Sequence, residues 1–434
     1  MARRETTTSR LDHTRPRERS RSWWRKARPY LMALGPGLLA ASAGNDAGGI
    51  ATYASAGATY GYQLIWAMVI VTICVGIVQE MSARLGAVTG KGFSDLVRES
   101  FSLRTTALIL LTLSIANLGL IVSEFVGVAA AAELFGVSRY IAVPLAAALV
   151  WLLITRGSYG RVERILLALT LVFFAYIAAA FLARPDWPAV FSQTLRPRPR
   201  LEVGYLQLLI ALIGTTISPY MQLYIQSSVV EKGVTPDEYP YTRFDVWAGT
   251  IFAGFVASFI IIATAATLYP RGIAIETAAN AAQALEPVAG PYASILFGIG
   301  LLGASLLAAG VLPLATTYVM SEALGFERGV SRSWAEAPIF MGLFTGLVLL
   351  GALLALIPGL PLFQVLVGVY VLNGLLLPIE LFAILSLINN RELMGQYVNR
   401  GLYNLLAWAI AIVVSLLSLM LIAITVLGWF GVTL

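Results

Sequence analysis

Long apolar runs recur along the whole chain, and each approaches the roughly 20 residues that a helix needs to cross a bilayer. Eleven such runs lie near 30–60, 62–88, 104–136, 138–156, 162–184, 203–228, 244–269, 290–320, 337–358, 362–389 and 402–429. Only helices fit them, because transmembrane β-strands are far shorter and alternate apolar with polar residues. The sequence therefore predicts an all-α polytopic membrane protein with 11 transmembrane helices.

The composition supports this class and excludes several others. Hydrophobic residues make up 58% of the chain and charged residues 12%, whereas a soluble domain carries about 25% charged residues. The single Cys (Cys74) lies in an apolar run and the single His (His13) in a charged segment, which excludes a disulfide scaffold and intramembrane imidazole chemistry. No loop is long enough for an extramembrane domain, so we expect neither an enzyme nor a bound cofactor.

The first 28 residues are strongly basic and hold 10 of the 29 Lys and Arg residues. We expect residues 1–28 to be a disordered cytoplasmic tail; the alternative is a tail that touches anionic lipid, with Trp23 and Trp24 at the interface. The net charge of +6 comes largely from this tail, so it does not indicate a nucleic-acid partner. Residues 29–434 are predicted to form one transmembrane domain.

The distribution of Lys and Arg predicts how the chain is oriented in the membrane. With the N-terminus in the cytoplasm, segments on that side hold 23 Lys and Arg residues and segments on the other side hold 6. One loop departs from this bias, because residues 184–202 place four Arg residues outside. The odd number of spans puts the C-terminus outside, and we expect a plasma-membrane (bacterial inner-membrane) location.

Two of the predicted spans are interrupted by residues that break or weaken a helix. They are Gly44, Asp46, Gly48 and Gly49 in the first span, and Thr215, Thr216, Ser218, Pro219 and Gln222 in the sixth. Irregular backbone at this depth is tolerated only where it lines a cavity or is buried in protein. Breaks in spans one and six indicate two inverted five-helix halves, about 29–184 and 203–389, with one extra helix at about 402–429. This arrangement is typical of a transporter with a site near the middle of the membrane.

Two acids inside predicted spans are candidates for chemistry. Asp46 lies in the glycine-rich break, and a carboxylate at mid-bilayer costs at least about 2.5–3.5 kcal/mol. Carboxylate, carbonyl and water oxygens are the ligands of a hard cation; the alternative is that Asp46 only caps the second half of its helix. Glu124, in the third span, could carry protons, support the cation site, or stay protonated against a neighbouring helix. The polar residues around Pro219 favour a hydrated cavity wall.

Four stretches of the chain together resemble one known family. They are GPGLLAASAGNDAGGIATYASAGATYGYQLIW, QEMSARLGAVTGKGFSDLVRE, IGTTISPYMQLYIQS and LPIELFAILSLINNRELMG. They resemble the Nramp (natural resistance-associated macrophage protein) family of divalent metal transporters, whose first and sixth helices carry the motifs Asp-Pro-Gly-Asn and Met-Pro-His. The resemblance extends over residues 35–395 and implies the LeuT-like (APC) fold of that family, a 5+5 inverted repeat with discontinuous helices 1 and 6.

Departures from the family motifs change the implied ligands. The resemblance places the family's metal-binding Asp at Asp46, but its Asn at Gly49 and its helix-six Met at Ser218. Met221 is an alternative for that Met, because one extra residue must be absorbed after Tyr220, which stands where the family has His. Oxygen donors and water favour Mg²⁺, whereas sulfur and nitrogen donors favour transition metals. Smaller side chains also leave room for an ion that keeps its waters.

The family's proton route is changed as well. Of two acids three residues apart in helix three, the chain keeps Glu124 and has Ile121 in place of the other. The predicted span 337–358 contains no Lys or Arg, so the family's helix-nine Arg is missing. The chain therefore resembles the Nramp-related magnesium transporter branch, in which Mg²⁺ moves without obligatory proton coupling. Glu124 is the candidate for a residual proton route.

The interrupted spans and the resemblance together define a predicted site. Its metal-binding positions are Asp46, the carbonyls of Ala43 and Thr215, and Ser218 and Gly49, which leave room for the ion and its waters. The residues predicted to line the cavity or to support the ligands are Asn45, Thr216, Tyr220, Met221, Gln222 and Glu124.

We therefore expect a monomeric membrane transporter that takes up Mg²⁺ by alternating access, with the divalent cation and the lipid bilayer as its partners. An inside-negative potential of about 100 mV supplies about 4.6 kcal/mol for two charges, which suffices without protons. Two alternatives stay open. One is a proton-coupled Mn²⁺/Fe²⁺ symporter of the ordinary Nramp type, and the other is a Na⁺- or proton-coupled symporter of an organic solute on the same fold.

Overall fold

The computed structural model describes residues 35–429, except for 157–160, 162–163, 166–167, 169–172, 201, 284–289, 291–292 and 331. Every regular element in these residues is a helix. Up to residue 231 they are α2 (Pro36–Ala43), α3 (Ala47–Tyr60), η1 (Gly61–Leu64), α4 (Ile65–Thr89), α5 (Phe93–Ser100), α6 (Leu103–Leu134), α7 (Arg139–Arg156), α9 (Phe173–Leu182), α10 (Trp187–Leu195), α11 (Val203–Thr216) and α12 (Pro219–Glu231). After it they are α13 (Tyr239–Thr267), η3 (Tyr269–Arg271), α14 (Ala278–Ala282), α16 (Ala293–Leu324), α17 (Pro338–Ala355), α18 (Leu362–Ile388), α19 (Arg391–Met394), η6 (Gly395–Tyr397) and α20 (Gly401–Trp429). The predicted tail, 1–28, lies outside the described residues.

Nine segments of the described chain are long and apolar enough to cross a membrane. One of them, Ala47–Thr89, contains parts of the first two predicted spans, because α3, η1 and α4 follow one another directly. The fifth predicted span, 162–184, lies partly outside the described residues, with α9 in the part that is described. The all-helical membrane fold is thus confirmed, whereas the count of 11 spans stays a prediction.

Both predicted interruptions are breaks between half-helices. The first span consists of α2 and α3, and the sixth consists of α11 and α12. Asp46 begins α3 as its N-cap, because its carboxylate accepts a hydrogen bond from the Gly49 amide at 2.8 Å. Ser218 precedes α12, and Pro219 follows as the first helical residue, where the missing N–H of proline is not needed.

Each break between half-helices includes fewer residues than the sequence indicated. Gly48 and Gly49 are helical residues of α3, and Thr215 and Thr216 are the last two residues of α11. Gln222 lies in the first turns of α12. The breaks are short because each second half-helix starts directly after its N-cap residue.

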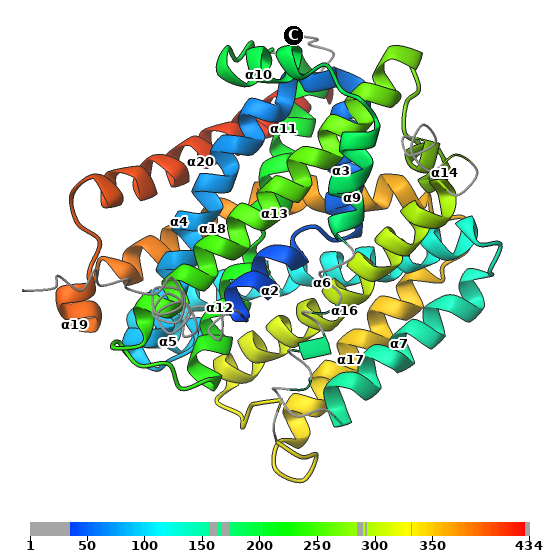
Figure 1. Ribbon diagram of the computed structural model, residues 1–434. Helices are drawn as coiled ribbons and strands as arrows, with labels where there is room; N and C mark the ends of the chain where they lie inside the picture. Colours follow the sequence, from blue (N-terminus) through cyan, green and yellow to red (C-terminus); the bar gives the residue numbers. More distant parts are fainter. Residues whose placement is uncertain are drawn as a thin grey trace, which may run out of the picture.

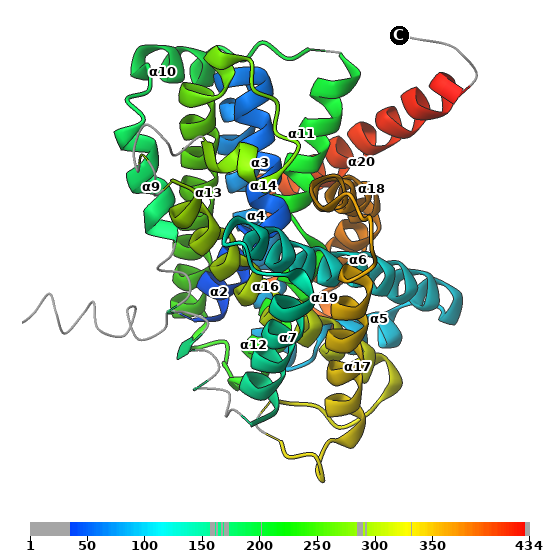
Figure 2. The same cartoon turned by 90° about the vertical axis from the view of Figure 1, so that its right-hand side faces the viewer.

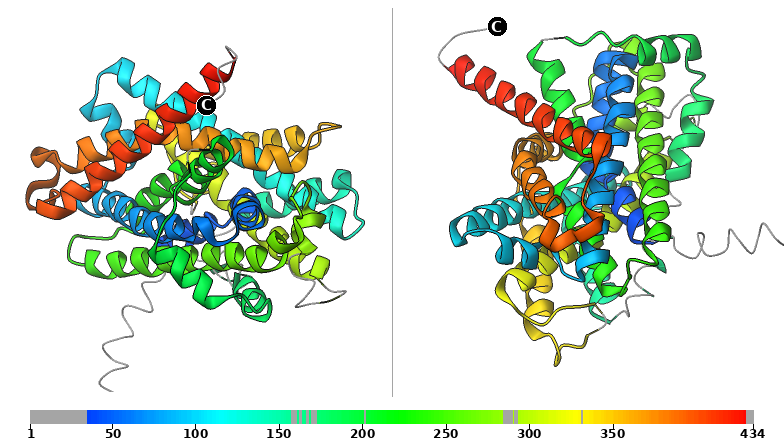
Figure 3. Two further views of the ribbon diagram at one scale, coloured as in Figure 1. Left: turned by 90° about the horizontal axis from the view of Figure 1, so that it is seen from above. Right: turned by 90° about the vertical axis from the view of Figure 1, so that its left-hand side faces the viewer.

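The broken helices lie in the middle of the bundle. α3 packs against α6, α11, α13, α16 and α18, and Figure 1 shows α2 and α3 near the centre of the molecule. In Figure 2, α6 crosses the direction of α3, α4 and α13. α10 marks one end of the molecule, toward which α3 and α11 extend, whereas α2 and α12 extend toward the opposite end. Seen from above in Figure 3, α20 lies at the edge of the bundle. This architecture brings the two breaks close together, because the Tyr220 hydroxyl of α12 donates to the carbonyl oxygen of Ala43 in α2 at 2.7 Å.

An acid of α13 holds the start of α2. Asp245 is fully buried, and its carboxylate accepts hydrogen bonds from the backbone amides of Gly35, Gly37 and Leu38 at 3.0, 2.6 and 3.1 Å. These are N–H groups that a helix leaves unpaired at its start. A Cβ on Gly37 would lie 2.6 Å from the backbone nitrogen of Val246, so the close approach of α2 to α13 depends on glycine.

Candidate metal site

The carboxylate of Asp46 lies where α2 and α3 meet and is fully buried. One of its oxygens accepts the hydrogen bond from Gly49, and the other accepts one from the hydroxyl of Tyr370 in α18. Among the residues that the structure describes, no Lys or Arg forms an ion pair with it. A buried charge without a counter-ion is costly, so this carboxylate is suited to hold a cation.

Three oxygen atoms surround the space that a Cβ on Gly49 would occupy, and they lie close to one another because glycine has no side chain there. A Cβ on this residue would lie 2.6 Å from the carbonyl oxygen of Gly44, 2.9 Å from Thr215 Oγ1 and 3.1 Å from Asp46 Oδ1. Thr215 Oγ1 is buried and has no hydrogen-bond partner in the described part of the chain. We call this space and its three oxygens the oxygen cradle. Carbonyl, hydroxyl and carboxylate oxygens are ligands that hard divalent cations take.

Two predicted ligand positions are engaged in other hydrogen bonds. The carbonyl oxygen of Ala43 accepts one from the hydroxyl of Tyr220 at 2.7 Å. Ser218 Oγ accepts one from the side-chain amide of Asn373 at 2.5 Å, and the same amide donates to the carbonyl oxygen of Gly214 at 2.9 Å. An ion that used either oxygen would have to share or displace these donors.

Two of the predicted cavity residues form hydrogen bonds with α13 and with α3. Asn45 donates to the carbonyl oxygen of Ala253 at 3.1 Å, and Thr216 shares a hydrogen bond of 3.0 Å with the hydroxyl of Tyr53. Asn45, Thr216 and Tyr53 border a cavity of about 10 Å³, which is close to the smallest volume that holds one water.

Met221 and Gln222 lie at the start of α12, close to the first break. The sulfur of Met221 accepts a hydrogen bond from Gln79 at 3.4 Å. A Cβ added to Gly44 would lie 3.3 Å from this sulfur. Both amide atoms of Gln222 are buried without a hydrogen-bond partner among the described residues. A buried amide without a partner can still form hydrogen bonds, either to a water molecule or to a group that binds the ion.

Glu124 of α6 reaches the first turn of α3. Its carboxylate accepts hydrogen bonds from the Ala47 amide at 3.3 Å and from the Ser123 hydroxyl at 3.2 Å. Asp46 is the residue before Ala47, so two acids share the N-terminus of one half-helix, where the helix dipole favours negative charge. Glu124 thus supports the segment that carries Asp46.

Two residues of α18, Tyr370 and Asn373, contact the site but were not found by sequence reasoning. They stand three residues apart and therefore lie on one face of the helix. Both are buried, although the predicted span 362–389 is otherwise largely apolar. A polar pair at this spacing within an apolar span is the signal that could have identified them.

The described part of the chain contains no group of three or more His, Cys, Asp or Glu residues that could hold a metal. The candidate site instead combines one carboxylate with neutral oxygens. Such a set resembles the protein share of a Mg²⁺ site, in which one or two carboxylates are supplemented by water.

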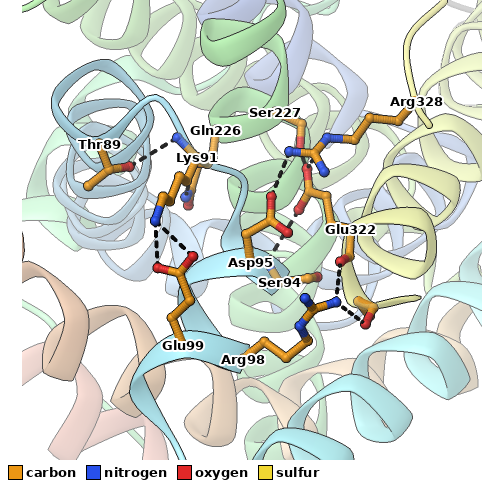
Figure 4. A network of polar contacts seen from close by, with 11 residues as sticks. Thr89, Lys91, Ser94, Asp95, Arg98, Glu99, Gln226, Ser227, Glu322 and Arg328 are labelled. Atoms are coloured by element: carbon orange, nitrogen blue, oxygen red, sulfur yellow. Dashed lines mark hydrogen bonds and ion pairs between the residues drawn. The ribbon is translucent and has the colours of Figure 1, made fainter. Parts of the chain in front are cut away.

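Another buried carboxylate, Glu322 at the end of α16, has different surroundings. Ser227 of α12 donates to it at 3.0 Å, and the Ser94 amide of α5 donates at 3.2 Å. The Arg328 guanidinium lies 3.6 Å from this carboxylate and 2.6 Å from that of Asp95. Figure 4 shows these five residues, which we call the Glu322 cluster. They join α5, α12 and α16.

Two half-helix pairs that meet at a buried, unpaired carboxylate define an ion transporter with discontinuous helices. The family model described as natural resistance-associated macrophage protein-like, Nramp, matches residues 37–424. The chain therefore belongs to the Nramp family of divalent metal transporters and is a transporter rather than an enzyme.

Individual relatives agree with this assignment. The divalent metal cation transporter MntH of Deinococcus radiodurans is 28% identical over 409 residues, which cover 91% of this chain and 90% of that protein. MntH of Yersinia pestis is 30% identical over 406 residues, which cover 91% of this chain and 95% of that protein.

Solved structures confirm the predicted LeuT-like fold. A manganese transporter of Eremococcus coleocola, in complex with an aromatic bis-isothiourea compound, matches with a TM-score of 0.75 at 19% identity, over 98% of this chain and 91% of that one. Mhp1, a nucleobase-cation-symport-1 family transporter, matches with a TM-score of 0.54 at 16% identity, over 91% of this chain and 92% of that one.

Proposed function

We propose that this chain takes up Mg²⁺ by alternating access, without obligatory proton coupling. The observation that carries the proposal is the oxygen cradle, in which Gly44, Asp46 and Thr215 offer only oxygen atoms. Mg²⁺ takes oxygen ligands and gives up its waters reluctantly. The three oxygens would supply part of its coordination sphere and leave the rest to water.

The residues at the start of α12 also favour Mg²⁺ as the transported ion. Ser218 offers a hydroxyl at the position where the family resemblance expects a thioether, and this hydroxyl is bound to Asn373. The sulfur of Met221 accepts a hydrogen bond from Gln79, which reduces its availability as a soft ligand. We therefore expect an ion held by oxygen and water rather than by sulfur.

The surroundings of Glu124 support uptake without proton coupling. Ile121, one turn earlier in α6, is fully buried and apolar, so α6 lacks the second acid that the family resemblance expects three residues before Glu124. The Glu124 carboxylate accepts a hydrogen bond from the Ala47 amide at the start of α3. We assign Glu124 a positioning role for Asp46, and the membrane potential the role of driving force.

The second candidate function is proton-coupled Mn²⁺ transport. The position of the Met221 sulfur beside Gly44 favours it, because a small rotation of this flexible side chain would bring a soft donor to the break. The names of the relatives, which are manganese or divalent metal cation transporters, favour it as well.

Purified protein in liposomes with an inside-negative potential distinguishes the two candidates. Mg²⁺-sensitive and pH-sensitive dyes inside the vesicles should report Mg²⁺ entry without acidification. Ser218→Met should raise Mn²⁺ entry relative to Mg²⁺ by about tenfold, because a thioether favours the softer ion. Ser386→Met, at an exposed position of α18, is the matched control and should change neither rate. Mn²⁺ entry with proton influx and no Mg²⁺ signal would reject the proposal in favour of the second candidate.

A further inference from the structure

Three arginines line a cavity at the α10 end of the molecule. The cavity has a volume of about 480 Å³, and Arg196, Arg198 and Arg200 form its wall together with Gln63 and Gln193. Alternation with proline in the segment RPRPR keeps this stretch extended. The arginines therefore form a basic pocket at one end of the bundle.

The positive charge of this pocket is largely unbalanced. No carboxylate in the described chain pairs with Arg196 or Arg198, and Arg200 lies 3.9 Å from Glu202 with both side chains more than half exposed. An exposed pair at this distance neutralises little. The loop is also the one that departs from the Lys and Arg bias of the chain. Such a pocket attracts an anion, and arginine recognises phosphate well.

An apolar groove lies on the membrane-facing side nearby, between α4, α11 and α20. Its volume is about 320 Å³ and its lining is hydrophobic, with Trp66 and Cys74 from α4, Leu209 and Ile213 from α11, and Leu406 and Val413 from α20. All three helices belong to candidate spans, and Figure 1 shows α20 beside α4. A groove in this place faces hydrocarbon, so its natural occupant is a lipid acyl chain.

The pocket and the groove are separated by a single helical turn. Gln63 lines the pocket and Trp66, three residues later, lines the groove. Trp66 donates to the hydroxyl of Tyr205 at 3.3 Å, and this hydroxyl donates to the carbonyl oxygen of Gln63 at 3.4 Å. One turn is about 5 Å, which is comparable to the thickness of the headgroup layer on each side of the hydrocarbon core. Trp is also typical of this interface.

We propose that this surface binds one anionic phospholipid. Its phosphate lies among Arg196, Arg198 and Arg200, and one of its acyl chains lies in the groove beside Trp66. The two chemistries match the two ends of such a lipid, and the pocket and the groove come within one helical turn of each other at Gln63 and Trp66. The segment that carries the arginines leads directly into α11, so the bound lipid would steady the first half of the broken sixth helix.

The single cysteine of the chain provides a site-specific test. Cys74 lines the groove, so a small fluorophore on this residue reports contact with lipid chains that carry a nitroxide quencher. In vesicles, phosphatidylglycerol with the quencher should act at about fivefold lower mole fraction than zwitterionic phosphatidylcholine with the same chain, because one arginine near the surface contributes about 1 kcal/mol of attraction to a net negative lipid. The triple variant Arg196→Gln, Arg198→Gln, Arg200→Gln should lose this preference.

A matched triple variant controls for overall charge. Arg104→Gln, Arg391→Gln and Arg400→Gln remove the same charge at exposed positions on other elements and should keep the preference. Native mass spectrometry of the unlabelled protein should show one anionic lipid retained by the parent and the control, and none by the pocket variant. Equal quenching by both lipids would overturn the proposal. Loss of the preference in excess inorganic phosphate, with chain contact unchanged, would also overturn it, because the pocket would then be a site for a free anion.

Discussion

Two buried carboxylates of this bundle, Asp46 and Glu322, have opposite electrostatic surroundings. Glu322 has the guanidinium of Arg328 at 3.6 Å and shares it with Asp95, so its charge is partly balanced within the protein. Among the described residues, the donors to Asp46 are neutral, the Gly49 amide and the Tyr370 hydroxyl. The comparison shows that burial of an acid does not by itself indicate a cation site. A missing counter-charge alone does not indicate one either, because Asp245 is equally buried and accepts hydrogen bonds only from backbone amides in the described chain. What sets Asp46 apart is its place between two half-helices.

The two carboxylates also differ in what they join. The Glu322 cluster connects three separate helices, and Arg98 adds hydrogen bonds to the carbonyl oxygens of Glu322 and Ala323 at the end of α16. Asp46 lies instead between two half-helices, beside a space left open by glycine. One acid fastens elements together, and the other leaves part of its coordination to a ligand.

Removing the charge of Asp46 should have the largest effect on transport. Asp46→Asn keeps the size of the side chain and removes the only charge of the oxygen cradle. We expect Mg²⁺ uptake into liposomes to fall by about 100-fold, since an interaction with a charged group is worth up to about 3 kcal/mol. Glu322→Gln is the control and should leave Mg²⁺ binding intact. Uptake by Asp46→Asn at the parent rate would show that the ion binds elsewhere.

Removing the positive charge of Arg328 from the Glu322 cluster should affect protein stability rather than Mg²⁺ binding. Arg328→Gln leaves Glu322 buried without its counter-ion, which should lower the free energy of unfolding by about 3 kcal/mol. Adding Glu322→Gln should restore part of this loss, because the unpaired charge is removed. Asp46→Asn, by contrast, should not lower stability. Denaturant or thermal unfolding in detergent measures all three, and an Arg328→Gln protein as stable as the parent would contradict the comparison.

Filling the oxygen cradle should have the smallest effect of the three. Gly49→Ala places a Cβ 2.6 Å from the Gly44 carbonyl oxygen, so the neighbours must shift and the ion loses room. We expect Mg²⁺ affinity to fall by about tenfold, which is about 1.4 kcal/mol. Gly342→Ala is the matched control, because a Cβ there meets nothing within 4 Å. Unchanged affinity in Gly49→Ala, measured by titration calorimetry, would place the ion outside the cradle.

Much of the fold and the central acid could be predicted from the sequence. A run of about 20 apolar residues can hardly be anything but a span, and a carboxylate inside it is conspicuous because the bilayer makes it costly. The same argument found Asp46 and Glu124. Pro219 located the second break, because proline cannot continue the helix before it.

The detailed contacts of the site could not be predicted, because they depend on how separate helices pack. Tyr370 and Asn373 reach the breaks only because α18 lies against α3 and α11. Thr215 was expected to offer its carbonyl, whereas its hydroxyl faces the cradle. Ser218 is bound to Asn373, a partner about 150 residues away in the chain. Local patterns carry no information on such pairs.

The hydrogen bonds between Asp245 of α13 and the start of α2 affect how these two helices can move. Tilting α2 away from α13 would break three hydrogen bonds to one carboxylate together, at about 1.5–3 kcal/mol each. This matches or exceeds the roughly 4.6 kcal/mol that two charges gain from a membrane potential of about 100 mV. We therefore expect α2 and α13 to stay together and to tilt as one rigid pair of helices. The 29 residues of α13 would then carry the movement of a short half-helix from one face of the membrane to the other.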